Sequence, residues 1–507
     1  MKAHPGQQTS LEQPTERRVA WTRSVSIGRI DWRWGLAIGC LAIGVGYAVA
    51  MPGGGFLSLI LGLIASALLV LVLDSAQAQV IAIGALFVVP LFNVVPVFRP
   101  QDNNFYLYAA LMLLVVGIKA AARSARGVGL IGVFVIWFLG MGIYSTIVLK
   151  PVPLYQHLTL PLGALGVYMV LSYGEQVSKR VFFRGFLIWS GIEAGIGLLQ
   201  ATVNLPLQSW SSQVYGEARN YIGYIVPGIS TRVRMSTGTF DHFNLLAALL
   251  SMALPIALVM WLEKKSMARG LYLALIAAGL VSTFSRGGFL GGCVGALLVY
   301  LALPRHSILH HLRIWVGVLG AIVSAIVLEQ AIAEYVSATQ NAIVRVATWS
   351  RAISYSLQDP FRLVFGSGLG YYTDAFLRLQ AGVAAQLHSA PIELLVETGV
   401  VGLALGTVIF VGVCVRGLRS KVPSSIGLGG ALAAFMVSQL FDNAFFTMTG
   451  VVVVGLLTVL DAETRNAKPE TLSRGAETSR PAADPYAAPQ AEDVGGDTGK
   501  AMGTKAG

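Results

Sequence analysis

The chain has 507 residues, of which 55% are hydrophobic and only 12% are charged. A soluble protein carries about 25% charged residues, so this composition excludes an ordinary soluble domain. The apolar residues gather in continuous stretches of roughly 17–25 residues, which is the length of a membrane-spanning helix. Because these stretches do not alternate with a period of two, they predict an all-α, polytopic transmembrane bundle rather than a barrel.

The net charge of +11 has two interpretations, binding of nucleic acid or basic loops beside anionic lipid. We favour the basic loops, because no patch of Lys and Arg is interleaved with aromatic residues. We therefore expect no nucleic-acid partner. Cys40, Cys293 and Cys414 all lie in apolar runs, where they are expected to pack as small side chains and not to bind a metal.

The apolar runs predict fourteen spans, or twelve if the short turns near 74–79 and 149–152 do not separate crossings. The domain that contains them covers residues 32–461, after a polar cytoplasmic tail at 1–31. Residues 462–507 are rich in Ala, Pro and Gly and are expected to form a disordered cytoplasmic tail. The spans are centred within 32–50, 56–73, 79–97, 105–118, 128–148, 153–173, 182–203, 239–262, 270–284, 288–303, 314–328, 390–415, 426–441 and 447–461.

Basic residues mark every second loop. Because cytoplasmic loops carry the excess of Lys and Arg, these loops and both termini are predicted to be cytoplasmic. The two long segments on the outer side are then 204–237 and 329–389. The second contains "NAIVRVATWSRAISYSL", which has helical periodicity, followed by the glycine turn "FGSGLGYY". We expect short helices in this loop that roof a cavity. The basic loops contain Lys119, Arg123, Arg126; Lys179, Arg180, Arg184; Lys264, Lys265, Arg269; Arg305, Arg313; and Arg416, Arg419, Lys421.

Ten cations break this rule because they fall on the predicted outer side, and nine of them are arginines. Arginine binds phosphate with a planar, permanently charged fork. The alternative is structural pairing with carboxylates such as Glu329, Glu334, Asp359 or Asp374. We favour pairing for two of them, Arg362 and Arg378. The ten residues are Arg99, Lys150, Arg219, Arg232, Arg234, Arg286, Arg345, Arg351, Arg362 and Arg378.

Arg286, in "VSTFSRGGFLGG", is the strongest candidate for an anionic ligand. Its neighbours Ser285, Gly287 and Gly288 offer no carboxylate, and the glycines leave room for a bulky group near the backbone. We therefore predict that Arg286 faces a phosphate at the outer membrane surface.

A second motif borders a span on the same side. "RVRMSTGTFDHFNLLAALL" places His242 and Asn244 at the entry to a span. Helix capping by Asp241 or Asn244 and contact with an anion are both compatible with this pattern. Glu193, near the middle of an earlier span, is either a functional acid or a paired one.

"QLHSAPIELLVETGVVGLAL" places His388 directly before a helix that Ser389 can cap. Histidine is the usual general base near neutral pH, although a lone interfacial histidine is more often structural. Glu393 either orients His388 or is itself the base. For Glu397, one turn further on, we favour packing.

The four motifs, in this order, resemble the O-antigen ligase and polymerase superfamily of bacterial inner-membrane proteins. The resemblance runs from about Arg232 to Gly402 and rests on "RMSTGTFDHFNLLA", "STFSRGGFLG", "RVATWSRA" with "FGSGLGYY", and "HSAPIELLVETGVVGL". The sequence departs from the family pattern at Phe243, where proline is common, and at Ser389, where asparagine is usual.

The resemblance implies periplasmic transfer of a glycan from undecaprenyl diphosphate, without a metal or other cofactor. A ligase passes the glycan to lipid A-core, and a polymerase passes it to another lipid-linked repeat unit, as in exopolysaccharide. Arg286 and Arg234 would bind the diphosphate, and Arg232 could take the role of Arg234. The surrounding membrane lipids are further partners. His388 would help the acceptor hydroxyl to lose its proton. Further candidates for donor or acceptor contact are Arg219, Arg345, Arg351, His242 and Asn244.

Other functions remain open at this stage. A flippase that moves lipid-linked glycan without chemistry needs polar residues along a path to both faces, whereas the charge here gathers at one face. A peptidoglycan glycosyltransferase needs an acidic catalytic residue in a large outer loop, and the segment that carries His388 fits a ligase better. Transfer to protein hydroxyls is a further variant. The sequence does not separate ligase from polymerase.

Overall fold

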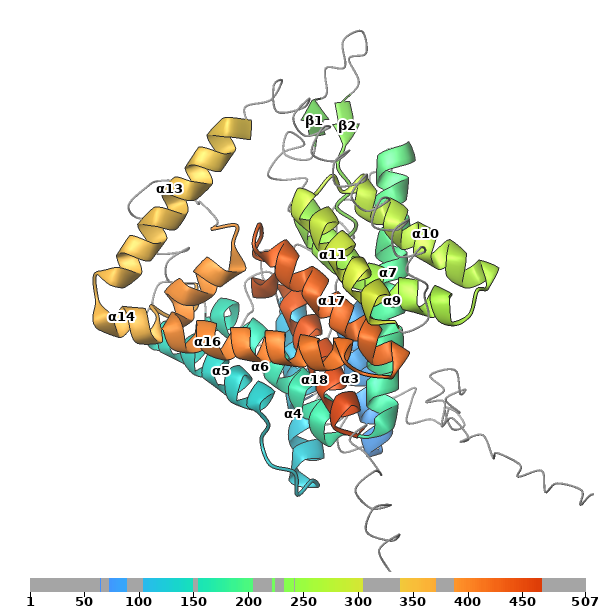
Figure 1. The fold of residues 1–507 in the computed structure, drawn as a ribbon. Coiled ribbons are helices and arrows are strands. Elements are labelled where there is room, and N and C mark those ends of the chain that lie inside the picture. The colour runs from blue at the N-terminus through green and yellow to red at the C-terminus, as the bar shows by residue number, and fades with distance from the viewer. Residues whose placement is uncertain are drawn as a thin grey trace, which may run out of the picture. The chain divides into compact units, whose positions relative to one another are not determined.

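A computed structural model describes residues 64, 73–88, 104–148, 154–203, 221–223, 232–240, 242–303, 338–370 and 387–466. Most of these residues are helical, as Figure 1 shows. The helices are α3 (Ser75–Val88), α4 (Asn104–Ala122), α5 (Leu130–Val148), α6 (Leu154–Tyr173), α7 (Gln176–Val203), α9 (Phe243–Glu263), α10 (Met267–Ser282), α11 (Arg286–Ala302), α13 (Ala338–Leu357), α14 (Pro360–Phe365), α16 (Ala390–Leu418), α17 (Pro423–Gln439), η5 (Ala444–Phe446) and α18 (Met448–Asn466).

The predicted all-α class is confirmed. Eleven of the fourteen expected spans coincide with helices, and those at 32–50, 56–73 and 314–328 lie almost wholly outside the described residues. Four described helices, α5, α7, α9 and α16, are long and apolar enough to cross a membrane. Several of the others are shorter apolar helices, and the protein is a multi-pass membrane protein.

A small sheet was not predicted. Strand β1 (Tyr221–Gly223) pairs antiparallel with β2 (Arg232–Arg234), with Tyr221 opposite Arg234 and Gly223 opposite Arg232. Each strand has three residues, which is too short for an alternating pattern to be recognised in a sequence. Both strands precede α9 and belong to the segment 204–237, which we had expected to be a loop.

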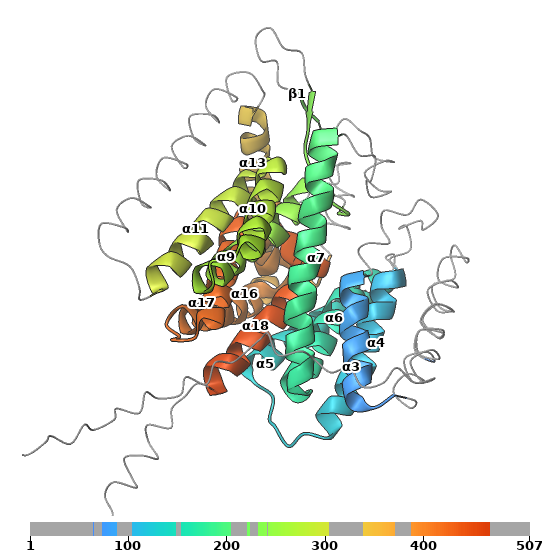
Figure 2. The same ribbon diagram turned by 90° about the vertical axis from the view of Figure 1, so that its right-hand side faces the viewer.

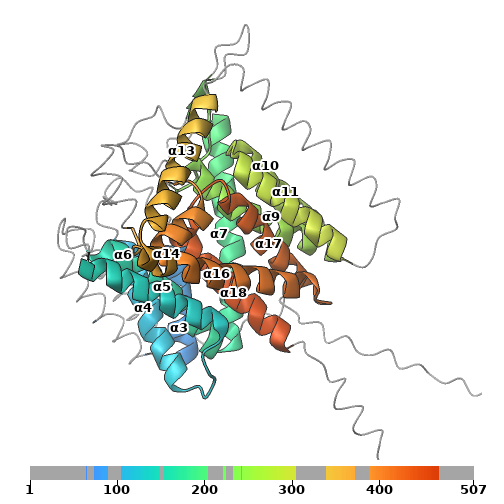
Figure 3. The same ribbon diagram turned by 60° about the vertical axis from the view of Figure 1, so that its left-hand side comes forward.

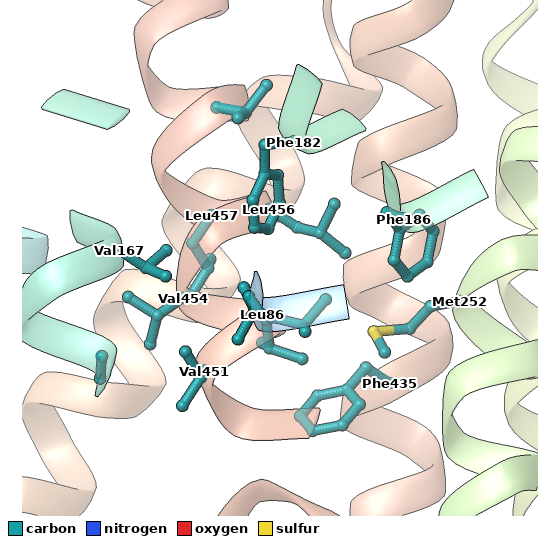
Figure 4. Packing of buried hydrophobic residues seen from close by; sticks show 14 of the residues in the cluster. Leu86, Val167, Phe182, Phe186, Met252, Phe435, Val451, Val454, Leu456 and Leu457 are labelled. Atoms are coloured by element: carbon teal, nitrogen blue, oxygen red, sulfur yellow. The ribbon is translucent and has the colours of Figure 1, made fainter. Parts of the chain in front are cut away.

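The helix α7 joins two groups of helices, with α3 on one side and the pair α9 and α10 on the other (Figure 2). Phe182 and Phe186 of α7 are fully buried. Figure 4 shows them in a cluster with Met252 of α9 and with Leu456 and Leu457 of α18. The two parts are thus held together by apolar side chains from widely separated segments.

A row of glycines on α11 allows close packing. A Cβ added at Gly288 would overlap that of Ala247 on α9. One at Gly291 or Gly295 would overlap a backbone carbonyl of α17. Small residues let membrane helices approach closely, so this row explains why α11 lies against both α9 and α17.

The helix α16 is broken at Gly399, which has a φ of 71° and a ψ of −176°. The break frees the carbonyls of Val396 and Glu397 from the helix. They accept hydrogen bonds from the backbone N–H of Ser367 (2.9 Å) and of Gly368 (3.0 Å). The glycine turn after α14 therefore docks into the interrupted helix, in a contact that Figure 3 shows between α14 and α16.

Candidate functional site

The starts of α9, α11 and α16 and the end of α17 lie together, and we name this region the His388 end. Ser236, before α9, donates its N–H to the carbonyl of Ser282 at the end of α10 (3.1 Å). Ala390, the first residue of α16, donates to the carbonyl of Asp442 after α17 (2.9 Å). Segments that carry the separate sequence motifs are thereby brought to one place.

His388 faces an acid that lies 54 positions further along the chain. Its Nδ1 lies 3.7 Å from Oδ1 of Asp442, and the two side chains are 26% and 10% exposed. Within the described residues, His388 Nδ1 and Asp442 Oδ2 are buried and have no hydrogen-bond partner. The two groups are thus close but not yet within hydrogen-bond distance, which is common in ligand-free active sites.

The backbone at His388 is in the left-handed region, with a φ of 48°. Such a conformation costs of order 1–3 kcal/mol in a residue other than glycine and persists only where the surrounding structure enforces it. The chain then enters α16 at Ser389. The side chain of Ser389 makes no capping hydrogen bond, contrary to our expectation. The Asp442 carbonyl bound to Ala390 N–H takes part in holding this helix start instead.

Glu393 lies one turn inside α16 and is only 4% exposed. Its Oε2 accepts a hydrogen bond from Nδ2 of Asn443 (3.0 Å). Asp442 and Asn443 are neighbours in the turn between α17 and η5, so this turn contacts the start of α16 through both residues. Glu397 is also buried, at 1% exposure, beside the break in the helix.

Arg286 is the first residue of α11, and its side chain is exposed. Ser285 is the N-cap, and its Oγ accepts from the N–H of Gly288 (3.3 Å). Phe284 before it has a φ of 52°. The arginine therefore stands at a helix N-terminus, where backbone N–H groups also favour an anion.

The glycines beside Arg286 do not leave the room for a ligand that we expected. Gly288 lies against Ala247, and a Cβ on Gly287 would come within 3.0 Å of Cβ of Phe441. Both positions serve helix packing. Room for a ligand near Arg286 must therefore lie on its exposed side.

Phe441 links the candidates to one another. Besides its contact with Gly287, its carbonyl accepts a hydrogen bond from Nη1 of Arg345 on α13 (3.4 Å). It directly precedes Asp442. The turn at 440–443 thus contacts α11, α13 and α16 within a few residues.

The helix α13 is docked beside His388. Nε1 of Trp349 donates to the carbonyl of Leu387 (2.6 Å). Ala352 and Tyr355 on the same face are buried against Leu387 and Val396. Arg351 lies on the exposed side of α13, away from this packing.

Glu193 proves to be a buried, fully engaged acid in α7. It accepts hydrogen bonds from Nε1 of Trp189 (3.0 Å) and from both the N–H (2.8 Å) and the hydroxyl of Thr239. Two turns further on, Oε1 of Gln200 accepts from the N–H of Thr237 (3.0 Å) and of Gly238 (2.9 Å). This polar stripe anchors the turn that leads from β2 into α9, so the paired alternative holds for Glu193.

The turn has a positive φ at Gly238, where a Cβ would overlap the Glu193 carboxylate. Arg232 and Arg234 lie on β2 just before it, and the positions of their side chains are not described. After it, His242 is the N-cap of α9, and its Nδ1 accepts from the N–H of Asn244 (3.2 Å). The cap is therefore His242 and not Asp241 or Asn244.

The predicted pairing of Arg362 with a carboxylate is confirmed. Arg362 forms an ion pair with Asp359 (3.3 Å).

Several other residues named in the sequence analysis lie outside the described part of the chain. The residues outside the described ranges are Arg99, Lys150, Arg219, Asp241, Glu329, Glu334, Asp374 and Arg378.

Asp442 is a candidate site residue that the sequence analysis missed. The sequence does point to Asp442: in "QLFDNAFF" an acid and an amide separate the last two apolar runs. In our own assignment of spans, this turn falls on the same membrane face as His388. Its proximity to His388 depends on how α16 and α17 pack, which the sequence pattern does not contain.

Residues 271–407 match the family model Wzy_C, described as O-antigen ligase. The match begins in α10 and ends within α16, so it takes in Arg286, Arg345 and His388. No curated protein matches the chain in a sequence comparison. The resemblance deduced from the motifs is thus confirmed over this stretch: the chain carries an O-antigen ligase domain of the Wzy_C family and is a membrane enzyme of the glycosyltransferase type.

Proposed function

We propose that this enzyme transfers a glycan from undecaprenyl diphosphate to an acceptor hydroxyl at the periplasmic face of the bacterial inner membrane. The observation that carries the proposal is the approach of His388 Nδ1 to Asp442 Oδ1 (3.7 Å), at the end of the bundle where Arg286 begins α11. A base and a phosphate-binding cation in one place are what this transfer requires.

In the proposed reaction, Asp442 accepts a hydrogen bond from Nδ1–H of His388, which leaves Nε2 with a lone pair. Nε2 takes the proton of the acceptor hydroxyl as its oxygen attacks the anomeric carbon. The bond from that carbon to the diphosphate oxygen breaks, and undecaprenyl diphosphate leaves. Glu393 holds the turn at Asn443 in place.

Arg286, with Arg234 or Arg232, binds the diphosphate and offsets the charge that develops on it as it leaves. The N-terminus of α11 adds to this field. The acceptor is the hydroxyl of lipid A-core in a ligase or of a second lipid-linked glycan in a polymerase. Arg219, Arg345, Arg351, His242 and Asn244 remain candidates for contacts with either substrate.

The test is a transfer assay in proteoliposomes with a lipid-linked glycan, with lipid A-core present or absent. Product only with lipid A-core identifies a ligase, and longer chains without it identify a polymerase. His388→Ala and Arg286→Ala should each reduce transfer by about 100-fold or more. Arg419→Ala is the control, because Arg419 is exposed at the opposite end of α16.

If no product forms with any acceptor while the lipid-linked glycan crosses the bilayer, the protein is a transporter. If His388→Ala transfers glycan as fast as Arg419→Ala does, His388 is not the base. Size-exclusion profiles of the variants show whether each is still folded.

A further inference from the structure

The short helix α14 lies deep along two membrane-spanning helices, although it belongs to the segment between spans that we expected to form an outer loop. The ring of Phe365 lies 6.1 Å from that of Trp137, in the middle of α5. Trp137 in turn contacts α16, where a Cβ at Gly402 would lie 3.1 Å from its Nε1. Figures 1 and 3 both show α14 against α16 and beside α5.

The depth of Phe365 can be bracketed from both helices. The two helices run antiparallel, because Gly402 lies near Trp137 and Gly406 near Phe134. From Trp137 to the end of α5 the helix rises ~17 Å, and from the start of α16 to Gly402 it rises ~18 Å. The hydrocarbon core of a bilayer is about 30 Å thick. If α5 and α16 cross the bilayer along its normal, these rises place Phe365 inside the hydrocarbon, on the side of the His388 end.

The charged side chains at the start of α14 have partners within the protein, which membrane depth requires. Asp359 caps α14 by accepting from the N–H of Phe361 (2.9 Å). The guanidinium of Arg362 pairs with Asp359 and lies 4.4 Å from the ring centre of Tyr355. The only arginine of α14 therefore has its charge balanced by Asp359, and the two side chains are 31% and 40% exposed.

The backbone of the turn after α14 is satisfied in the same way. The N–H of Gly366 donates to the carbonyl of Arg362 (2.7 Å). The next two N–H groups, of Ser367 and Gly368, donate to the carbonyls released by the break in α16. Non-helical backbone at membrane depth is tolerated only where protein groups bind it, and this turn meets that condition.

The outward face of α14 is apolar. Phe361 is 56% exposed, Val364 40% and Phe365 38%. This face continues through the Phe365–Trp137 contact onto α5, whose exposed side chains include Ile136 (50%) and Ile143 (46%). Exposed apolar side chains of this kind mark an interaction surface, and α5 is long and apolar enough to cross a membrane.

We propose that α14 and the glycine turn form a re-entrant element, embedded among the hydrocarbon chains of the bilayer leaflet on the His388 side. Phe361, Val364 and Phe365 contact the acyl chains of that leaflet. The element packs against α16, the helix that begins two residues after His388. This proposal does not depend on the reaction proposed above.

The test uses the full-length protein in phospholipid vesicles, with its three cysteines replaced by serine. A spin label is attached at Phe361→Cys and, in a second variant, at Val364→Cys. Collision with oxygen, which partitions into hydrocarbon, is compared with collision with a water-soluble nickel chelate. Labels at Ile136→Cys and Lys265→Cys give the lipid and water references, because both positions are exposed.

We expect labels at 361 and 364 to behave as the label at 136 does, with a loss of collision with the chelate relative to 265. Chelate collision at the level of 265 would overturn the proposal. So would a label shielded from both reagents that shows dipolar broadening, because a second copy of the chain would then cover this face.

Discussion

The starts of α11 and α16, which carry the main candidate residues, have similar backbone conformations but are stabilised by different hydrogen bonds. Phe284 and His388 both have left-handed backbones, with φ of 52° and 48°, and each is followed by a serine N-cap. At α11 the serine hydroxyl binds Gly288 N–H within its own turn. At α16 the serine makes no such bond, and the carbonyl of Asp442 binds the helix start from another segment.

The start of α11 is therefore stabilised by a hydrogen bond within its own turn, and the start of α16 by a hydrogen bond from another segment. The start of α11 presents Arg286 by rules that act within four residues. The start of α16 presents His388 only when the turn after α17 is in place. We infer that the helix start which presents His388, the proposed base, depends on the turn after α17, whereas the cap that presents Arg286, the proposed diphosphate ligand, is formed within its own turn.

The largest effect is expected when the carboxylate of Asp442 is removed. Asp442→Asn keeps the carbonyl that binds Ala390 but removes the carboxylate facing His388. We expect kcat to fall by about 100-fold with little change in stability, because the imidazole loses the group that orients it. Steady-state kinetics with the lipid-linked donor measure this.

The matched control is Asp461→Asn. Asp461 pairs with Arg416 (2.9 Å) at the far end of α16, remote from His388, and the Arg416 side chain is 53% exposed, so the pair contributes about 1 kcal/mol. Its transfer rate should equal that of the wild type. Equal rates in both variants would remove Asp442 from the mechanism.

An intermediate effect is expected from overpacking behind Arg286. In Gly288→Ala the new methyl group meets Ala247, so the free energy of unfolding should fall by about 1–3 kcal/mol. Gly140→Ala on α5 is the control, since a Cβ there has no neighbour within 4 Å. That variant should be as stable as the wild type or more stable by up to about 1 kcal/mol. Thermal unfolding in detergent compares them, and equal melting temperatures would contradict the packing role.

The smallest effect is expected from removing the serine hydroxyl at each of the two helix starts. Ser285→Ala removes a capping hydrogen bond and should cost about 1 kcal/mol of unfolding free energy. Ser389→Ala removes none and should cost distinctly less. Denaturant unfolding of the two variants side by side decides this. A larger loss in Ser389→Ala would show that the start of α16 is capped by its own serine after all.

The helical class and most span positions followed from the sequence because apolar runs of membrane length admit few other structures. Arg286 and His388 were also singled out as candidates from the sequence, since both interrupt the apolar pattern at span boundaries, and their roles stay predictions. The predicted cap of α9 was wrong because several polar residues compete at that start, and His242 takes the position. The strands β1 and β2 were too short to leave a pattern.

The sequence by itself determined that this is a multi-pass helical membrane protein with an O-antigen ligase domain, because hydrophobicity and motif order are properties of neighbouring residues. Only the tertiary structure decided that Asp442 faces His388, that Glu193 anchors the turn before α9, and that the glycine turn after α14 fills the break in α16. These contacts join residues separated by about 30 to 50 positions or more, and which of them meet depends on how the helices pack.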